Sequence, residues 1–399
     1  MEEKMERIAR IMVILFFSLF LFGNLIAFFL QEEKTYSYYE NRNLAKLPEA
    51  SKETLSNGQW GSDMESYLAD HTTAREIMLT ADTWIDLNVL YRPVVNDVVV
   101  GENCLLPYLP DWMEDTSTIS EDVAEITANL SSVDTLVSSY GGQYYYVAVP
   151  CQYVCHQKDY PWYLNNRAEY TAESVEQLTK ALGDAGISFV DIGVSYAQRD
   201  WDPSLSSAVD NHYSIEGAYL TYQTIMERIC NDRKQELPLL EEGNYTITEL
   251  PNPYLGSRMR KLLDLWSSDE RLKILTPKEE IPFTRLNGGT EEESYLYRLP
   301  ETEEEDVLYS VYMGGDQPFT VIDTHRPELP SILVYGDSFT NAAESLLYYG
   351  FDKMYSFDFR YYHEKSLGEV IMQYQPDVVV CIRDYEALLS TDSNGCGVE

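Results

Sequence analysis

Basic residues are scarce in this chain of 399 residues, which has 29 Lys and Arg against 66 Asp and Glu. The formal net charge is −37 at pH 7. Nucleic acids are bound through cations that neutralise their phosphates, and anionic membrane surfaces attract clusters of Lys and Arg. The charge therefore argues against both as partners. It fits a neutral or cationic partner, or solubility alone.

Histidine is also scarce, with five residues, and cysteine is limited to six. Cys151, Cys155 and His156 resemble a fragment of a zinc site, but no second Cys/His pair completes it. We prefer a local disulfide or buried thiols, and we predict no metal and no cofactor. The even cysteine count is compatible with disulfides outside the cytoplasm, although their pairing cannot be read from the sequence.

A long apolar run, Ile11 to Leu30, contains no charged residue. As a helix, about 20 residues span roughly 30 Å, the thickness of a bilayer core. Basic residues precede the run, which favours a cytoplasmic N-terminus. A cleaved signal peptide is the alternative, but the run is long for one and no A-x-A-like site follows. We predict a cytoplasmic tail at 1–10, an uncleaved single-pass anchor at 11–30, and residues 31–399 outside the cytoplasm.

Beyond the anchor, the residue patterns predict two regions. Residues 31–95 carry mixed helical patterning and predict a membrane-proximal helical region. Residues 96–399 alternate between strand-like and helix-like stretches, which predicts an α/β domain with a parallel sheet. Residues 233–310 break this rhythm and are interpreted as an inserted, partly β segment with solvated acidic loops. The expected strands are 98–100, 143–150, 188–192, 354–359, 377–382 and one beginning at Ser331, and the expected helices are 120–140, 168–182, 216–230, 342–349 and 365–374.

In the membrane-proximal region, His71 directly follows Asp70. A catalytic pair is one interpretation, but no nucleophile motif lies nearby. We prefer a structural hydrogen bond for the histidine, or a salt link from Asp70 to Arg75.

The stretch from Ser331 to Gly336 reads as a buried strand, and Asp337-Ser338 and a helix-like stretch follow it. A tight turn between strand and helix holds a side chain at the carboxyl edge of the sheet, where α/β proteins place their sites. Gly336 lets the backbone turn sharply, and Ser338 would sit where helix N–H groups converge. That position suits a nucleophile whose intermediate carries an oxyanion. From this stretch alone, a helix cap is the preferred interpretation.

An activated serine needs a base and a group that orients the base. His212 stands out because Asp210 lies two residues before it, in a loop that opens a helix. Side chains at i and i+2 of an extended segment point to the same side, so both can face one cleft. Asp210 would fix the tautomer of His212, which would take the proton from Ser338. Taken alone, Asp-x-His is a weak pattern, and an incidental exposed histidine is the alternative.

Together, these motifs resemble the DHHW family, relatives of the alginate O-acetylation proteins that have an SGNH-hydrolase-like domain. The resemblance covers most of the region after the anchor. It implies a three-layer α/β/α fold with an SGNH-like domain at 96–399, and a Ser338–His212–Asp210 triad. The matching segments are Glu40-Asn41-Arg42 with Leu44, Asp70-His71 with Arg75, Asp210-Asn211-His212-Tyr213, Val311 to Pro318, Gly336 to Phe339 with Asn341, and Asp358 to Tyr362.

The resemblance also implies a function. A serine-dependent O-acyltransferase or carbohydrate esterase would handle acyl esters, usually acetyl, on an exported cell-envelope polysaccharide. Because cytoplasmic thioester donors do not reach residues outside the membrane, a transferase would need a membrane-bound O-acyltransferase as its partner. The alternative is a non-catalytic polysaccharide-binding or assembly protein that keeps the fold.

The sequence departs from the family pattern at the motif itself and at the predicted oxyanion hole. Asn211 and Tyr213 replace the first His of the pair and the Trp, while Asp210 and His212 are intact. Asp316 stands where the family commonly has Asn, and an ionised carboxylate cannot donate a hydrogen bond to an oxyanion. This departure slightly favours the non-catalytic alternative. The other candidate donors are the Ser338 N–H, a Gly315 N–H and Asn341.

Overall fold

The computed structural model describes residues 2–32, 34–40 and 42–399. Met1, in the expected tail, and Asn41, in the Glu40-Asn41-Arg42 signature, lie outside the described residues, as does Glu33. The chain divides into two compact units, Met1–Asn96 with Arg260–Leu265, and Asp97–Met259 with Trp266–Glu399.

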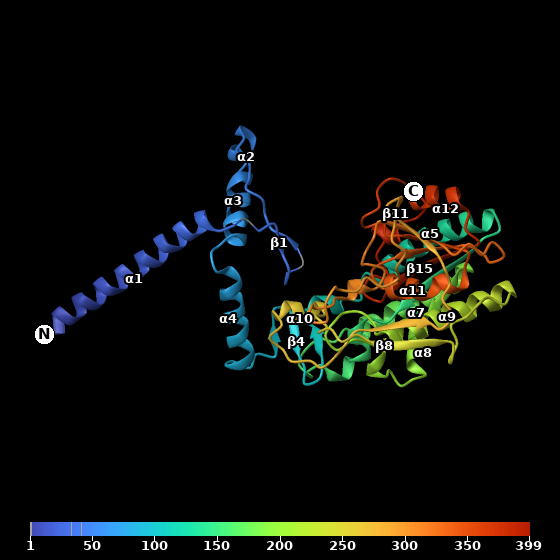
Figure 1. Cartoon of the computed structure of the whole chain (residues 1–399), viewed down its shortest axis with the longest axis horizontal. Helices are drawn as coiled ribbons and strands as arrows, with labels where there is room; N and C mark the ends of the chain where they lie inside the picture. Colours follow the sequence, from blue (N-terminus) through green and yellow to red (C-terminus); the bar gives the residue numbers. More distant parts are fainter. Residues whose placement is uncertain (1, 33, 41) are drawn as a thin grey trace. The chain divides into compact units, whose positions relative to one another are not determined.

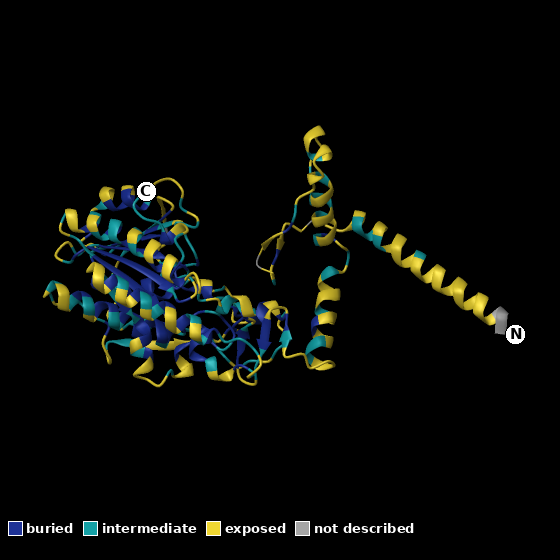
Figure 2. Cartoon of the chain, turned by 180° about the vertical axis from the view of Figure 1, so that it is seen from behind, coloured by how far each residue is buried: buried dark blue, intermediate teal, exposed yellow. Residues whose placement is uncertain are grey.

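The first unit consists mainly of helices. Within its first helix, the segment Met5–Leu30 is long and apolar enough to cross a membrane. The side chains of residues 5–30 of this helix are largely exposed (Figure 2), as expected of a helix whose apolar surface requires a non-aqueous environment. The elements are α1 (Glu2–Leu30), β1 (Tyr36–Ser37), β2 (Arg42–Asn43), α2 (Lys52–Ser56), α3 (Gln59–Asp70), α4 (Arg75–Asn88) and β3 (Val94–Val95).

Asp70 in this unit is paired differently from our prediction. Its carboxylate accepts hydrogen bonds from Arg42 at 2.5 and 2.8 Å, while Arg75 pairs with another carboxylate. The predicted salt link from Asp70 to Arg75 is therefore wrong, because the pairing of β1 with β2 brings a closer guanidinium to Asp70. The structural hydrogen bond predicted for His71 is confirmed, since its Nε2 lies 2.9 Å from the carbonyl oxygen of Ala45.

The second unit is built on a central sheet. Five neighbouring strands of this sheet run parallel to one another, in the order β14, β13, β15, β6 and β7, which confirms the predicted parallel sheet. The strands β11, β10 and β12 add an antiparallel edge that was not predicted. In spatial order the strands are β11 (Thr290–Glu292), β10 (Thr284–Asn287), β12 (Phe319–Asp323), β14 (Lys353–Phe357), β13 (Ile332–Gly336), β15 (Val378–Asp384), β6 (Gln143–Val149) and β7 (Ser188–Asp191).

Helices cover both faces of this sheet (Figure 1). On one face α5 (Ile119–Ser139) packs with α7 (Ala168–Ala185) and α12 (Leu367–Tyr374). On the other face lie α8 (Ile192–Ala197), α9 (Ile215–Arg233) and α11 (Thr340–Leu347). The buried side chains of α5 recur every three or four residues, so one apolar stripe faces the strands. The predicted three-layer α/β/α architecture is confirmed.

The expected insertion at 233–310 contributes to two sheets. An antiparallel pair of strands from this segment, β8 and β9, stands apart, whereas β10 and β11 extend the central sheet. The acidic run 301–306 is exposed, as predicted for a solvated loop. The remaining elements used below are β4 (Val98–Val100), β5 (Leu105–Pro107), α6 (Gln152–Cys155), β8 (Tyr245–Glu249), α10 (Ser257–Lys261) and β9 (Lys273–Pro277).

All six cysteines lie within the described residues, and each is a free thiol. The disulfides with which the even count was compatible are therefore not formed. Buried thiols, the other interpretation, apply to Cys104, Cys151, Cys155 and Cys381. Such thiols pack as small apolar side chains.

Candidate active site

The strand β13 is buried along its whole length and carries Ser338 just beyond its carboxyl end. A Cβ atom on Gly336 would lie 1.9 Å from the carbonyl oxygen of Ile382 on β15. Only glycine therefore allows the two backbones to approach this closely. Ser338 is partly exposed at this edge of the sheet, directly before α11.

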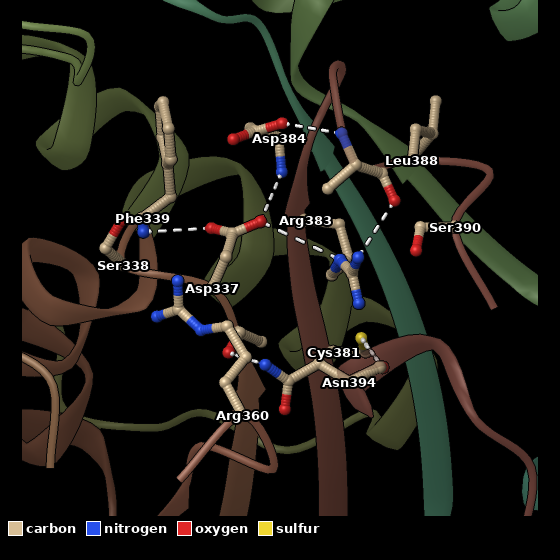
Figure 3. Close-up of polar contacts among 12 residues, drawn as sticks. Asp337, Ser338, Phe339, Arg360, Cys381, Arg383, Asp384, Leu388, Ser390 and Asn394 are labelled. Carbon is tan, nitrogen blue, oxygen red and sulfur yellow. Dashed lines mark hydrogen bonds and ion pairs between the residues drawn. The ribbon is translucent and has the colours of Figure 1, made fainter. Parts of the chain in front are cut away.

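Asp337 fixes the turn from both sides (Figure 3). Its Oδ1 accepts the N–H of Phe339 and its Oδ2 accepts the N–H of Asp384, both at 3.0 Å. The Nε of the buried Arg383 lies 3.7 Å from the same Oδ2, which is an ion-pair distance and not a hydrogen bond. Asp337 thus braces the start of the helix, while the hydroxyl of Ser338 faces another partner.

That partner is His212, whose Nε2 lies 2.7 Å from Ser338 Oγ. Its Nδ1 lies 2.5 Å from Asp210 Oδ1, and Asp210 Oδ2 accepts the backbone N–H of Ser257 at 2.6 Å. Burial disfavours the charged form of Asp210, but the charge and hydrogen bond of His212 and the backbone N–H groups outweigh it and lower the pKa. An ionised Asp210 accepts the Nδ1 proton, which leaves Nε2 to accept the proton of Ser338.

Aromatic rings hold the imidazole in place. The ring of Tyr309 stacks on His212 with a centroid distance of 3.6 Å and an interplanar angle of 3°. Tyr213, which replaces the family Trp, donates its hydroxyl to the carbonyl oxygen of Phe339 in the nucleophile turn. The sequence did not indicate Tyr309, because no motif marks a stacking partner almost a hundred residues away.

Glu270 supports the loop that carries Asp210 and His212. Its Oε2 accepts the hydroxyl of Ser207 at 3.1 Å and the N–H of Ala208 at 2.9 Å. The Ser207 hydroxyl oxygen in turn accepts the N–H of Asp210 at 3.0 Å. Burial raises the pKa of Glu270 to about 7. The sequence did not indicate Glu270, because no recognisable motif surrounds it.

The residues predicted near the oxyanion hole make different contacts. Asp316 Oδ1 accepts the amide of Asn341 at 2.8 Å, and its Oδ2 accepts Arg360 Nη2 at 3.0 Å. The Gly315 N–H donates to the carbonyl oxygen of Tyr312 at 3.0 Å.

The N–H of Ser338, by contrast, has no hydrogen-bond partner among the described residues. Since the amide of Asn341 carries two protons and Asp316 accepts one, the second proton is also a candidate donor. Ser338 N–H and Asn341 are therefore better candidates than Gly315.

Arg360, in the segment Asp358 to Tyr362 that resembles the family, links Asp316 to the sheet. Its guanidinium binds Asp358 through Nε at 2.9 Å and Nη2 at 2.6 Å. Asn394 donates to Asp358 at 3.0 Å and to the carbonyl oxygen of Gly336 at 2.6 Å. A continuous polar network thus joins the turn before Ser338 to the carboxylate that orients Asn341.

No protein-family model and no curated protein sequence matches the chain. Its structure is similar to that of Bacillus cereus PatB1 with a sulfonyl adduct, at 20% identity over 76% of this chain and 97% of that chain, with a TM-score of 0.61. It is also similar to a DHHW family protein from Eubacterium siraeum DSM 15702, at 15% identity over 75% and 95% of the two chains, with a TM-score of 0.57. The predicted resemblance to the DHHW family is confirmed at the level of the fold.

Proposed function

We propose that this chain is an extracytoplasmic, serine-dependent O-acyltransferase or esterase that handles acetyl esters on a cell-envelope polysaccharide. One observation carries the proposal: a continuous hydrogen-bonded chain runs from Asp210 through His212 to the hydroxyl of Ser338. Nucleophile, base and orienting carboxylate are the groups that acyl transfer requires, and such a triad is defined by geometry and not by order in the chain.

In the first half-reaction, Ser338 Oγ attacks the carbonyl carbon of the acyl donor while His212 Nε2 takes the hydroxyl proton. The Ser338 N–H and the amide of Asn341 stabilise the oxyanion. Protonation of the leaving oxygen by His212 then breaks its bond to the carbonyl carbon and leaves an ester on Ser338.

In the second half-reaction, a sugar hydroxyl or water gives its proton to His212 and attacks the acyl carbon of the ester on Ser338. Collapse of the oxyanion returns the proton from His212 to Ser338 Oγ. A sugar hydroxyl gives O-acetylation and water gives hydrolysis, so one site supports either outcome.

The site would lie outside the cytoplasm on a single-pass anchor, with the N-terminus of α1 inside. The apolar helix that could cross a membrane contains the uncharged run Ile11 to Leu30, and basic residues directly before this run support the topology. A membrane-bound O-acyltransferase would supply the acyl group, because thioester donors remain in the cytoplasm.

The second candidate function is a non-catalytic polysaccharide-binding or assembly protein. It is favoured by Asp316, which accepts hydrogen bonds from Asn341 and Arg360 and offers no donor to an oxyanion when ionised. Under this alternative the hydrogen-bonded chain would be structural.

The two functions are separated by assaying the full chain in detergent against a chromogenic acetyl ester. Ser338→Ala and His212→Ala are assayed beside it, and each is expected to retain the fold but lose about 10⁴-fold or more in kcat/KM. Equal rates in all three proteins would reject the catalytic proposal and leave the binding function.

A further inference from the structure

A second histidine–carboxylate pair lies outside the candidate active site. His156, at the end of α6, has its Nδ1 2.8 Å from Asp159 Oδ2. Cys104, in the turn between β4 and β5, lies beside this pair. One ligand atom each from Cys104, His156 and Asp159 lies within 4.8 Å of the other two.

The ring of His156 is buried, with only 5% of the residue exposed, and turns its Nδ1 toward Asp159. An ion held between these two side chains would bind Nδ1 of a neutral imidazole in place of the proton that the pair now shares. The ring proton would then reside on Nε2, which has no hydrogen-bond partner in the part of the chain that the structure describes.

Cys104 supplies a sulfur ligand beside the other two side chains. Its thiol is buried and free, and its Sγ lies within 4.8 Å of a ligand atom of His156 and of Asp159. A divalent cation would displace the thiol proton on binding. Asp159 is exposed and His156 lines a cavity of about 430 Å³, so an ion from solvent can reach the cluster.

We propose that Cys104, His156 and Asp159 form a binding site for a transition-metal ion of the Zn²⁺ type. One sulfur, one nitrogen and one oxygen ligand suit this borderline-soft ion and do not suit Mg²⁺ or Ca²⁺, which prefer oxygen ligands alone. Three protein ligands leave one coordination position for water.

The bound ion would stiffen the segment that holds the candidate active site. Next to Cys104, the N–H of Leu105 donates to the carbonyl oxygen of Ala208 at 2.7 Å, two residues before Asp210. Gln152 in α6 donates its side-chain amide to the carbonyl oxygen of Leu105 at 2.8 Å. The ion would thus cross-link the β4–β5 turn to the end of α6, and both elements contact this loop. Metal binding itself does not depend on the proposed acyl chemistry.

The test is a titration of the metal-free full chain in detergent with Co²⁺ alone. We expect a near-ultraviolet thiolate-to-Co²⁺ charge-transfer band that saturates at one ion per chain and disappears in Cys104→Ser. The double variant Cys230→Ser/Cys396→Ser removes the more accessible thiols and should keep the band. A band that survives in Cys104→Ser, or no band in the unmodified chain, would overturn the proposal.

Asp159→Ala provides a second variant at an exposed position, where folding is not expected to suffer. It should weaken Co²⁺ binding about tenfold or more. Zn²⁺ should raise the Tm of the unmodified chain and raise that of Asp159→Ala less at the same concentration. Equal affinity and an equal Tm shift in the two proteins would contradict the assigned ligand set.

Discussion

Two Asp-x-His segments in the second unit have nearly the same local geometry. In Asp210-Asn211-His212 the histidine N–H lies 3.1 Å and the ring Nδ1 2.5 Å from the carboxylate oxygen. In Asp323-Thr324-His325 the corresponding distances are 2.8 and 3.0 Å. The spacing alone therefore brings the carboxylate to the ring in both.

The two pairs differ in the surroundings of the second ring nitrogen, Nε2. The side chain of His212 is 10% exposed and its Nε2 meets Ser338, whereas the side chain of His325 is 61% exposed. Asp323 also pairs with Lys353 at 3.2 Å, while Asp210 is buried. The short motif thus sets the contact between carboxylate and ring, and the turn after β13, 126 residues further along the chain, places Ser338 Oγ at the second ring nitrogen.

The largest difference between the pairs should appear on replacing each carboxylate by an amide. Asp210→Asn should lower kcat/KM for an acetyl ester about 10⁴-fold, because an amide no longer fixes the productive tautomer of His212. Asp323→Asn should change it by about twofold or less, as at most surface positions. Steady-state kinetics measure both, and equal losses would contradict the distinction.

Ser338, which lies next to His212 Nε2, can be displaced by a substitution at Gly336 in the preceding strand. Gly336→Ala puts a methyl group against Ile382 and should lower the free energy of unfolding by about 3 kcal/mol. In Gly183→Ala, on α7, the new methyl group meets no atom within 4 Å, and the change should stay within about 1 kcal/mol. Denaturant unfolding measures the two, and a stable Gly336→Ala would refute the close approach of β13 to β15.

Glu270, which supports the loop that carries Asp210 and His212, should make the free energy of unfolding depend on pH. Since burial raises the pKa of Glu270 to about 7, the folded chain binds this proton more tightly than the unfolded chain. Its contribution is present at low pH and is lost as pH rises from about 4.5 through 7, by about 2 kcal/mol after allowance for solvent. Glu270→Gln should flatten that slope in unfolding measurements, and the exposed control Glu303→Gln should not.

We expect the smallest effect from replacing Tyr309, whose ring packs on the imidazole of His212. Tyr309→Leu removes the ring that stacks on His212 and should lower kcat/KM about fivefold. Tyr309→Phe keeps the ring and should retain activity. If both variants behaved alike, stacking on His212 would not matter for positioning.

The sequence could predict the elements whose patterns are local. Neighbouring residues alone were enough to predict the strand before Gly336, the helix at 168–182 and the Asp-x-His spacing. The family resemblance then joined His212 to Ser338, and the structure has these two side chains within hydrogen-bond distance. Their catalytic role stays a prediction.

The features that could not be predicted depend on contacts between distant segments. No local pattern indicates that Tyr309 stacks on His212, that Glu270 holds the loop at Ala208, or that β12 pairs with β14. The salt link predicted for Asp70 failed for the same reason, because a guanidinium from another segment lies closer. Disulfides were allowed by the even cysteine count, which contains no information on distance.

The most direct test of the central claim is to trap the acyl-enzyme. The full chain is mixed with a chromogenic acetyl ester, quenched in acid during turnover and analysed by peptide mass spectrometry. We expect one acetyl group on the hydroxyl of Ser338, absent in Ser338→Ala and accumulating more slowly in His212→Ala. Ester turnover that persists in Ser338→Ala, with acetyl on another residue or on none, would contradict it.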